Sequence, residues 1–560
     1  MVNSGNPVAR PSGAVLHNSP APTRTRSASG RATSAPAREG AGVSSTTEQQ
    51  PRRGVSLVLT FLRGVERVGN KLPNPFWLFV ILAGVVLVLS TVLERLGAYA
   101  VSPMDGERVE VRGLLSAEGI QVIFADAVDN YVNFPPLGLI LVMMLGVVVA
   151  EQSGLLSAML RGSVTRVPAK WLTFVVALTG ICGSVASDAA YVVLVPLAAL
   201  VFQAVGRSPV VGIIVAFAAV SAGWNATLVI APTDALLAGV STEAASFIDP
   251  DHVVTPIANY FFNAASAIVL AIVITLVTEL LLSKRSDATA DDESGHATEG
   301  DNELGELVVN RLERRGLLAA GLTLLACAVL VTAALVPSGS VFRGDDGSVM
   351  ASPLIEGIAV LLGVVFMLVG IAYGVVVGTI TRPVDIPTFM AKGVRDLAPV
   401  LVLFFAAAQF LAYFDWSGMA EVLAIRGAEW LGDLALPTAV LFVGMIIFAA
   451  LLNMLITSGS AQWTLIAPVF IPMFMLLGVE PEVTQALYRI ADSTTNIITP
   501  MSPYFVLILG FIQRYRSNAG IGTLISLTLP LSVALFVTWV AFFLGWYALG
   551  LPLGPGVPID

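Results

Sequence analysis

Charged side chains within apolar segments are the residues of this sequence best suited to do chemistry. Arg489 and Asp492 lie three positions apart in one such segment, and Asp188 and Asp234 lie in two others. A charge in apolar surroundings is costly, so each is a candidate functional residue. The planar guanidinium of Arg489 suits a carboxylate or sulfonyl group of a ligand. The alternative is a structural ion pair with Asp492, one helical turn away.

The three carboxylates, Asp188, Asp234 and Asp492, are candidates for carrying a proton or balancing a bound cation. Burial disfavours the ionised form of a carboxyl group, which brings proton exchange within reach of neutral pH. The alternative is that each carboxylate caps the N-terminus of an interrupted helix, where backbone N–H groups lack partners.

Neutral side chains add an aromatic platform and a set of oxygen atoms. Trp463 offers a flat face on which a ligand's aromatic ring could stack. The alternative is a Trp that only packs in the core. Four side chains beside predicted helix breaks offer oxygens that suit Na⁺ or that satisfy unwound backbone: Asn225, Asn453, Thr495 and Asn496.

Five prolines are predicted to shape the helix breaks, because proline lacks a backbone N–H and leaves a carbonyl free. They are Pro196, Pro232, Pro468, Pro481 and Pro500. Of these, Pro481 and Pro500 are expected to fix the entry and the break of a single helix.

The elements that must position these residues are membrane helices. Of the 560 residues, 56% are hydrophobic and 12% are charged, and the mean hydropathy is +0.82. Soluble proteins carry about 25% charged residues, so this chain could not cover a soluble surface. The two cysteines exclude a disulfide framework and a cysteine-based metal site. The sequence contains no HExxH, GxSxG or Walker A pattern, which argues against a zincin, a serine hydrolase and a P-loop ATPase.

The apolar runs predict an all-α polytopic membrane protein with about nine transmembrane helices, two re-entrant hairpins and two discontinuous helices. Residues 1–54 are expected to form a disordered tail, which flanking basic residues assign to the cytoplasm. The first half, 55–282, holds a hairpin at about 171–204 and a broken helix at about 209–247. An acidic cytoplasmic linker, 283–313, leads to the second half.

The second half, 314–550, holds a hairpin at about 438–477, a broken helix at about 481–514 and the last helix, before a C-terminal tail at 551–560. Like residues recur between the halves at one offset of 272 positions: Pro196 and Pro468, Gly206 and Gly478, Pro209 and Pro481, Ser221 and Ser493. Charge counts give the two hairpins opposite orientations. Inverted repeats with discontinuous helices are typical of secondary transporters, whose sites lie near the midplane of the membrane.

Four motifs resemble those of the AbgT family of p-aminobenzoyl-glutamate transporters. Residues 69–75 (GNKLPNP) resemble the motif before the family's first span, and 187–196 (SDAAYVVLVP) resemble its first hairpin. Residues 458–463 (SGSAQW) resemble the second hairpin, and 489–500 (RIADSTTNIITP) the broken helix after it. The resemblance covers about residues 55–550.

The resemblance implies a fold similar to that of sodium-coupled dicarboxylate transporters. It also implies a homodimer in which each protomer has a scaffold domain and an inner core that holds both hairpins. The family is described as importing p-aminobenzoyl-glutamate or exporting sulfonamides and related antimetabolites. Its important positions match Asp234, Asn453, Ser460, Trp463, Pro481, Arg489, Asp492 and Pro500 in this sequence.

We therefore expect a cation-coupled secondary transporter of small aromatic compounds in the bacterial cytoplasmic membrane, working by alternating access. The expected partners are a small-molecule substrate, the lipid bilayer and a second copy of the chain. We expect no nucleic-acid partner, no enzymatic activity, no cofactor and no metal other than a coupling Na⁺, with H⁺ as the alternative.

Two alternatives remain at this point. A carrier of aliphatic dicarboxylates on the same fold would also use Arg489, although Trp463 favours an aromatic ligand. A remote alternative is an intramembrane aspartyl protease that uses Asp188 and Asp234, but Arg489 and the repeat do not serve that chemistry.

The acidic linker should be dispensable for transport. We expect deletion of residues 287–303 to leave substrate flux into vesicles largely intact, because a solvated spacer makes no contact with the core. Replacing the same residues by an equally long Gly/Ser segment separates the effect of length from that of charge. Loss of flux at normal membrane expression would instead assign the linker a regulatory role.

Overall fold

The computed structural model describes residues 71–284 and 308–559, together with residues 60, 62, 64 and 67. Isolated positions within these ranges are excepted: 104, 105, 166, 187, 338, 345, 346, 350 and 351. The predicted tail 1–54 and most of the predicted linker 283–313 lie outside the described residues.

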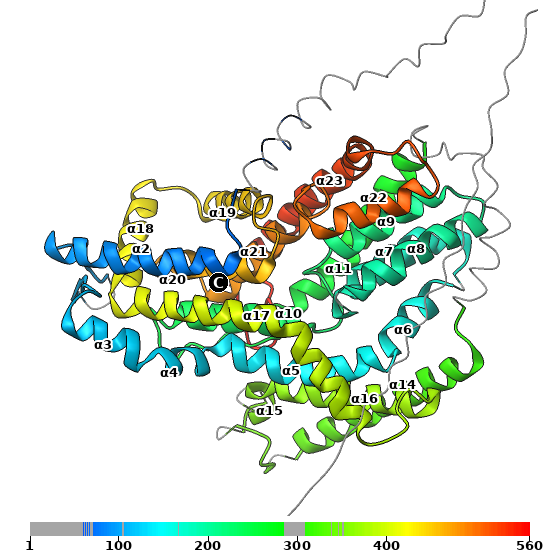
Figure 1. Cartoon of the computed structure of the whole chain (residues 1–560), viewed down its shortest axis with the longest axis horizontal. Helices are drawn as coiled ribbons and strands as arrows, with labels where there is room; N and C mark the ends of the chain where they lie inside the picture. The colour runs from blue at the N-terminus through cyan, green and yellow to red at the C-terminus, as the bar shows by residue number, and fades with distance from the viewer. Residues whose placement is uncertain are drawn as a thin grey trace, which may run out of the picture. The chain divides into compact units, whose positions relative to one another are not determined.

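Eight helical segments of the described chain are long and apolar enough to cross a membrane, which confirms an all-α, multi-pass architecture. Seven are continuous helices: α2 (Pro75–Arg95), α5 (Pro135–Gln152), α11 (Tyr260–Leu280), α14 (Arg311–Leu335), α16 (Ile358–Val377), α17 (Asp385–Trp416) and α23 (Ile521–Ala548). The eighth, Ala169–Ala186, is the first arm of the first predicted hairpin. The two remaining crossings of the predicted nine are the broken helices, which consist of shorter pieces (Figure 1).

The predicted hairpins and broken helices correspond to pairs of short helices. In the first half they are η1 (Ala169–Trp171), α7 (Leu172–Ile181), η2 (Cys182–Ala186) and α8 (Ala189–Ala204), followed by α9 (Pro209–Ala222) and α10 (Pro232–Ala245). In the second half they are α19 (Thr438–Asn453) and α20 (Gly459–Met475), followed by α21 (Pro481–Thr494) and α22 (Pro503–Gln513). Whether the hairpins re-enter the membrane stays a prediction.

Small elements connect these helices. They are β1 (Tyr99–Val101), β2 (Arg108–Glu110), α3 (Ala117–Ala125), α4 (Ala127–Val132), α6 (Leu155–Val164), η3 (Leu282–Lys284), α15 (Pro353–Glu356) and α18 (Met419–Asp433). The two strands pair antiparallel, with Tyr99 opposite Glu110.

Proline explains where the four broken-helix segments begin. α9, α10, α21 and α22 each have proline in the first turn, where the missing N–H would have no intrahelical partner. Pro232 begins α10 after the first break, Pro481 lies at the entry to α21, and Pro500 lies in the gap after α21. The gap that contains Pro500 ends at Pro503, which was not among the predicted prolines.

The prediction for Pro196 and Pro468 was wrong. Both lie inside continuous helices, α8 and α20, which run on to Ala204 and Met475. Pro468 is buried, and the helices packed around α8 and α20 supply the contacts that stabilise a helix with one missing backbone bond.

The internal repeat is visible in the helix bounds. Adding 272 to the bounds of α9, 209 and 222, gives those of α21, 481 and 494. Gly206 and Gly478, which follow α8 and α20, have φ angles of 74° and 78°. This left-handed conformation favours glycine and ends a helix. The chain therefore turns in the same way before α9 and before α21, whereas the opposite orientation of the two units stays a prediction.

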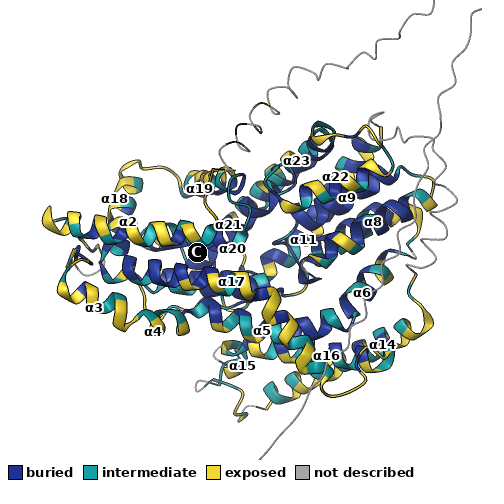
Figure 2. Cartoon of the chain, viewed as in Figure 1, coloured by how far each residue is buried: buried dark blue, intermediate teal, exposed yellow. Residues whose placement is uncertain are grey.

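Two helices form the centre of the core. All fourteen residues of α9 and all fourteen of α21 are buried. α9 contacts α7 and α8 of the first hairpin, and α21 contacts α19 and α20 of the second. α9 and α21 also contact each other. By contrast, α14 buries Gly316 and Ala320 and is otherwise teal or yellow in Figure 2. The interrupted helices thus lie inside, and the continuous α14 faces outward.

A close approach of two glycines holds α5 against α16. A Cβ atom placed on Gly146 would lie 1.7 Å from the carbonyl oxygen of Gly363. One placed on Gly370 would lie 2.6 Å from the Cα of Ala150. The two helices therefore pack backbone to backbone, as small residues permit between membrane helices.

Gly146→Val should destabilise the protein by about 1–3 kcal/mol or more, because the side chain must force α5 away from α16. The measurement is the thermal unfolding midpoint of detergent-purified protein. Gly138→Val is the matched control in the same helix, since no atom lies within 4 Å of a Cβ there. Equal midpoints for the two variants would contradict this packing.

Candidate functional site

The two helix breaks meet at a cluster of polar side chains. The Nδ2 of Asn225, in the gap after α9, donates to Asp492 Oδ2 at 2.7 Å and to Ser493 Oγ at 3.0 Å. Asn453, at the end of α19, donates from its Nδ2 to the carbonyl oxygen of Asp492 at 2.6 Å. Residues from both halves of the chain therefore stabilise the end of α21, where helical hydrogen bonding stops.

A cavity of about 290 Å³ opens beside this cluster. The residues that line it come from both hairpins and both broken helices: Asp188, Tyr191, Trp224, Thr457, Ser458, Gly459, Asp492, Asn496, Ser502, Pro503 and Tyr504. Asp188, Ser458 and Ser502 are the N-cap residues of α8, α20 and α22. The cavity thus collects three helix N-termini, whose partial positive charges favour an anionic group.

Aromatic rings form one wall of the cavity. Tyr191 and Tyr504 stack with ring centroids 3.7 Å apart and planes 5° apart. The ring of Trp224 lies 6.2 Å from Tyr191 at 23°. Tyr504 Oη donates to Asp188 Oδ1, and Ser221 Oγ donates to Tyr191 Oη at 3.0 Å. These aromatic residues were not predicted as a group. Trp224 lies within a predicted break, and Tyr191 and Tyr504 follow predicted breaks by a few residues, which is the signal that could have found them.

The buried guanidinium of Arg489 pairs with a carboxylate from the other half of the chain. Arg489 Nη1 lies 2.7 Å from Asp234 Oδ1, and the side chains are 1% and 4% exposed. Arg489 Nε also donates to Asn259 Oδ1 at 3.1 Å. The alternative given for Arg489, an ion pair with Asp492, is not found, because the guanidinium pairs with Asp234 of α10 while Asp492 accepts from Asn225.

Asp234 has a second role as a helix cap. Its Oδ2 accepts a hydrogen bond from Ala231 N at 2.7 Å at the start of α10. This is the capping alternative given for the carboxylates. Asp188, by contrast, makes no side-chain capping bond to α8, so its carboxylate is available to Tyr504.

Two buried oxygens near the cavity lack a hydrogen-bond donor within the described part of the chain. They are Asp492 Oδ1 and Asn453 Oδ1. Asn453 Nδ2 reaches Thr495 Oγ1 at 2.8 Å and Asn496 Oδ1 at 3.0 Å. Thus Asn453, Asp492, Thr495 and Asn496, four of the predicted oxygen-bearing residues, do come together. The unpartnered oxygens of Asp492 and Asn453 could ligate a cation, and the Asp492 carboxylate could take up a proton.

Trp463 does not line the cavity, contrary to the expected stacking role. It is fully buried, with its Nε1 donating to Ser241 Oγ at 3.1 Å and its ring 4.5 Å from Tyr488. Trp463 therefore packs α20 against α10 and α21. Ser460 also lies off the cavity wall, with its Oγ 3.3 Å from that of Ser458.

A separate group of side chains could hold a metal ion. Ligand atoms of His252, Glu480 and Glu482 all lie within 4.8 Å of one another at the start of α21. His252 Nε2 lies 3.2 Å from Glu482 Oε1, and this hydrogen bond raises the pKa of His252. None of the three lines the cavity, and an exposed Glu beside a His–Glu pair is a common surface arrangement, so we assign them no part in the site.

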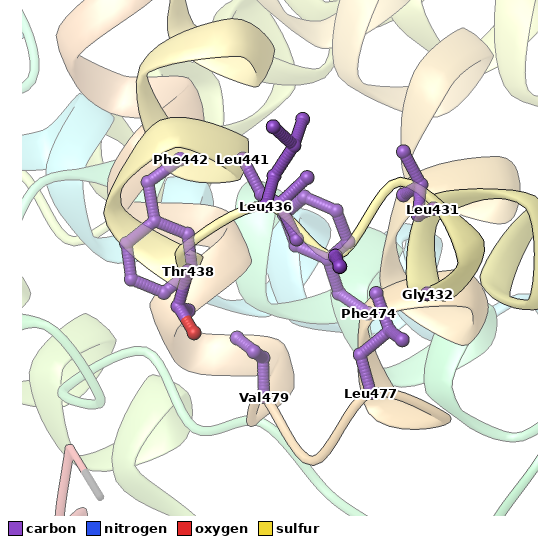
Figure 3. A pocket seen from close by; sticks show the side chains of 10 residues that line it. Leu431, Gly432, Leu436, Thr438, Leu441, Phe442, Phe474, Leu477 and Val479 are labelled. Carbon is purple, nitrogen blue, oxygen red and sulfur yellow. The ribbon is translucent and has the colours of Figure 1, made fainter.

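A second cavity, of about 150 Å³, lies beside the start of α19 and the end of α20, away from the turn that joins these two helices (Figure 3). Leu431, Leu436, Leu441, Phe442 and Phe474 line it together with other, mostly apolar, residues. The described residues that line this second cavity include no charged group, so it does not have the chemistry of the first.

Comparisons with known proteins agree with this architecture. Residues 60–560 match the model of the AbgT putative transporter family. The p-aminobenzoyl-glutamate transport protein of Escherichia coli K12 is 39% identical over 497 residues, which cover 88% of this chain and 96% of that protein. Two transporters of known structure are similar in structure as well. YdaH of Alcanivorax borkumensis has 43% identity and a TM-score of 0.81, over 86% of this chain and 100% of YdaH. MtrF of Neisseria gonorrhoeae, described with a class of antimetabolite efflux pumps, has 41% identity and a TM-score of 0.84, over 89% of this chain and 100% of MtrF.

Arg489→Met should destabilise the protein by about 3–5 kcal/mol, because it leaves the Asp234 carboxylate buried without its cation. Adding Asp234→Asn should restore much of this loss, since asparagine is neutral and its oxygen can still accept from Ala231 N. Thermal unfolding of the purified variants measures both effects.

Arg426→Ala is the control for this experiment. Arg426 pairs with Glu429 and donates to the carbonyl oxygen of Tyr99. The Arg426 and Glu429 side chains are 55% and 50% exposed, so the loss of Arg426 should cost only about 1–2 kcal/mol. An Arg489→Met variant as stable as this control would contradict a structural role for the buried pair.

Proposed function

The chain belongs to the AbgT family of transporters, and we propose that it carries p-aminobenzoyl-glutamate or a related aromatic antimetabolite across the bacterial cytoplasmic membrane. The observation that carries the proposal is the cavity between the helix breaks. Its aromatic wall suits the aryl ring of such a compound, and the helix N-termini of α20 and α22 suit the carboxylates. Both chemical halves of the substrate thus find a counterpart in one cavity.

The carboxylate end of the substrate is best served by α20 and α22. Ser458 and Ser502 bring hydroxyl groups to the wall beside the first backbone N–H groups of these helices. Helix ends of this kind bind anions in other discontinuous-helix transporters. In this proposal Ser460, Trp463 and Arg489 position the hairpin and α21 and do not contact the ligand in the conformation described.

We propose that a cation, Na⁺ or H⁺, couples to transport at Asp492. The supporting observation is the pair of buried, unpartnered oxygens, Asp492 Oδ1 and Asn453 Oδ1, beside Thr495 and Asn496. Asp234 is less suited, because Arg489 already balances its charge. Asn225 and Asp188 contact the site through Asp492 and Tyr504.

The remaining proposals concern the assembly and its motion. An inner core with both hairpins would move against a scaffold that includes α5 and α16, and expose the cavity to each side in turn. We further propose a homodimer with the N-terminus in the cytoplasm. The protein is a transporter and not an enzyme, which removes the protease alternative. A carrier of aliphatic dicarboxylates is disfavoured by the aromatic rings of Tyr191, Trp224 and Tyr504 in the cavity.

Proteoliposomes should take up labelled p-aminobenzoyl-glutamate when a cation gradient is imposed. Na⁺ and H⁺ gradients are applied in turn, in both directions, and succinate serves as the aliphatic dicarboxylate. Flux of succinate without flux of the aromatic compound would reverse the assignment of substrate class.

Asp492→Asn should abolish gradient-driven accumulation and keep equilibrium binding of the substrate within a few-fold, because asparagine fills the same space without a charge or an exchangeable proton. Asp433→Asn, at the exposed end of α18, is the control and should transport as the wild type does. Undiminished accumulation in Asp492→Asn would place the coupling site elsewhere.

A further inference from the structure

Tyr504 fills the aromatic part of the cavity with a group that resembles the proposed substrate. Its ring lies parallel to Tyr191 at 3.7 Å, and the hydroxyl at its para position donates to Asp188 Oδ1. A p-aminobenzoyl group has the same two features, a flat ring and a hydrogen-bond donor at the para position. The Tyr504 side chain therefore already occupies the aromatic part of the cavity and donates the hydrogen bond that Asp188 accepts there.

The partners of Tyr504 are held in place from the first half of the chain. Tyr191 is 4% exposed and accepts a hydrogen bond from Ser221, so its ring has little freedom to move. Asp188 makes no capping bond to α8. Its carboxylate thus remains available to a donor in the cavity, whether that donor is Tyr504 or a ligand.

Tyr504 itself is placed where it can leave. It is the second residue of α22 and follows the gap between α21 and α22. Its side chain is partly exposed, whereas Tyr191 is buried.

We propose that Tyr504 occupies the aryl subsite in place of the substrate, and that the substrate's p-amino-aryl group displaces it, stacking on Tyr191 and donating its N–H to Asp188. This inference rests on the proposed function. It assigns Tyr191 and Asp188 as the residues that bind the substrate's ring and its para donor. Asp188 thereby becomes a specificity-determining residue. Because Asp188 and Tyr191 belong to the first hairpin and Tyr504 to the second broken helix, binding breaks one contact between the halves.

The energetic consequences separate the roles of the two residues. Any aryl ligand must break the bond between Tyr504 and Asp188, but only a ligand with a para donor replaces it. Removing the Tyr504 hydroxyl should therefore tighten every aryl ligand by the same factor and leave their ratio unchanged. A hydrogen bond to a charged group should make the protein bind ligands with a para donor about 10- to 100-fold more tightly than those without one. Removing the Asp188 carboxylate should abolish this preference.

The test is equilibrium binding of p-aminobenzoyl-glutamate and benzoyl-glutamate to the purified full-length protein and its variants. We expect the wild type to prefer the amino compound by about 10-fold or more. Tyr504→Phe should bind both compounds more tightly at a constant ratio, and Asp188→Ala should bring the ratio close to one. Tyr547→Phe, which removes a hydroxyl from a ring packed on Phe442, is the control and should change neither affinity.

A ligand series on the wild type tests the same idea without any change to the protein. The p-hydroxy analogue, which keeps a donor, should bind like the amino compound, and the p-methoxy analogue should bind like benzoyl-glutamate. Equal binding of all four compounds, or an unchanged ratio in Asp188→Ala, would overturn the assignment of the aryl subsite and leave the proposed function standing. No binding of any of them to the wild type would overturn both.

Discussion

The ion pair between Arg489 and Asp234 joins the two halves of the chain inside its core, where neither charge has water to stabilise it. Each charge offsets the desolvation cost of the other, because an isolated charge in such surroundings costs several kcal/mol. Asp234 also fixes the start of α10 through Ala231, and Arg489 is anchored to Asn259. The position of α21 relative to α10 follows from these contacts, and with it the position of the Asp492 end of α21 at the cavity.

The helix breaks impose a related requirement. Where α9 and α21 stop, backbone groups lose their helical partners within an apolar environment. After α9, the backbone N–H of Asn225 donates to Ser493 Oγ. At the end of α21, the side-chain amide of Asn453 donates to the carbonyl oxygen of Asp492, and Ser532 of α23 donates to the carbonyl oxygen of Thr494. The same unwound backbone that requires these contacts also leaves helix N-termini facing the cavity. Stability and ligand recognition therefore draw on one set of interrupted helices.

The sequence predicted the parts of this structure that depend on local pattern. Apolar runs placed α2, α5 and α23, and glycine and proline near Gly223 and Pro232 placed the first break, because these residues act on the backbone at their own position. The pattern could not identify the partner of Arg489. A spacing of three residues suggested Asp492 as an alternative partner, whereas Asp234 is brought to Arg489 only by packing α10 on α21. The stacking role predicted for Trp463 failed for the same reason. A sequence motif gives a residue's neighbours along the chain, but it does not show whether the side chain faces the cavity or the packed core.

The separation of Asp234 and Arg489 along the chain has a consequence for biosynthesis. Arg489 is synthesised 255 residues after Asp234, which at typical rates takes roughly 13 to 51 s. During this interval α10 can be delivered to the membrane, but its carboxylate has no counter-charge. The nascent chain must keep that carboxyl group protonated, or hold α10 at the membrane surface, until α21 emerges. Formation of the ion pair is therefore a late event in the maturation of this protein, and the ribosome completes most of the chain before its core can close.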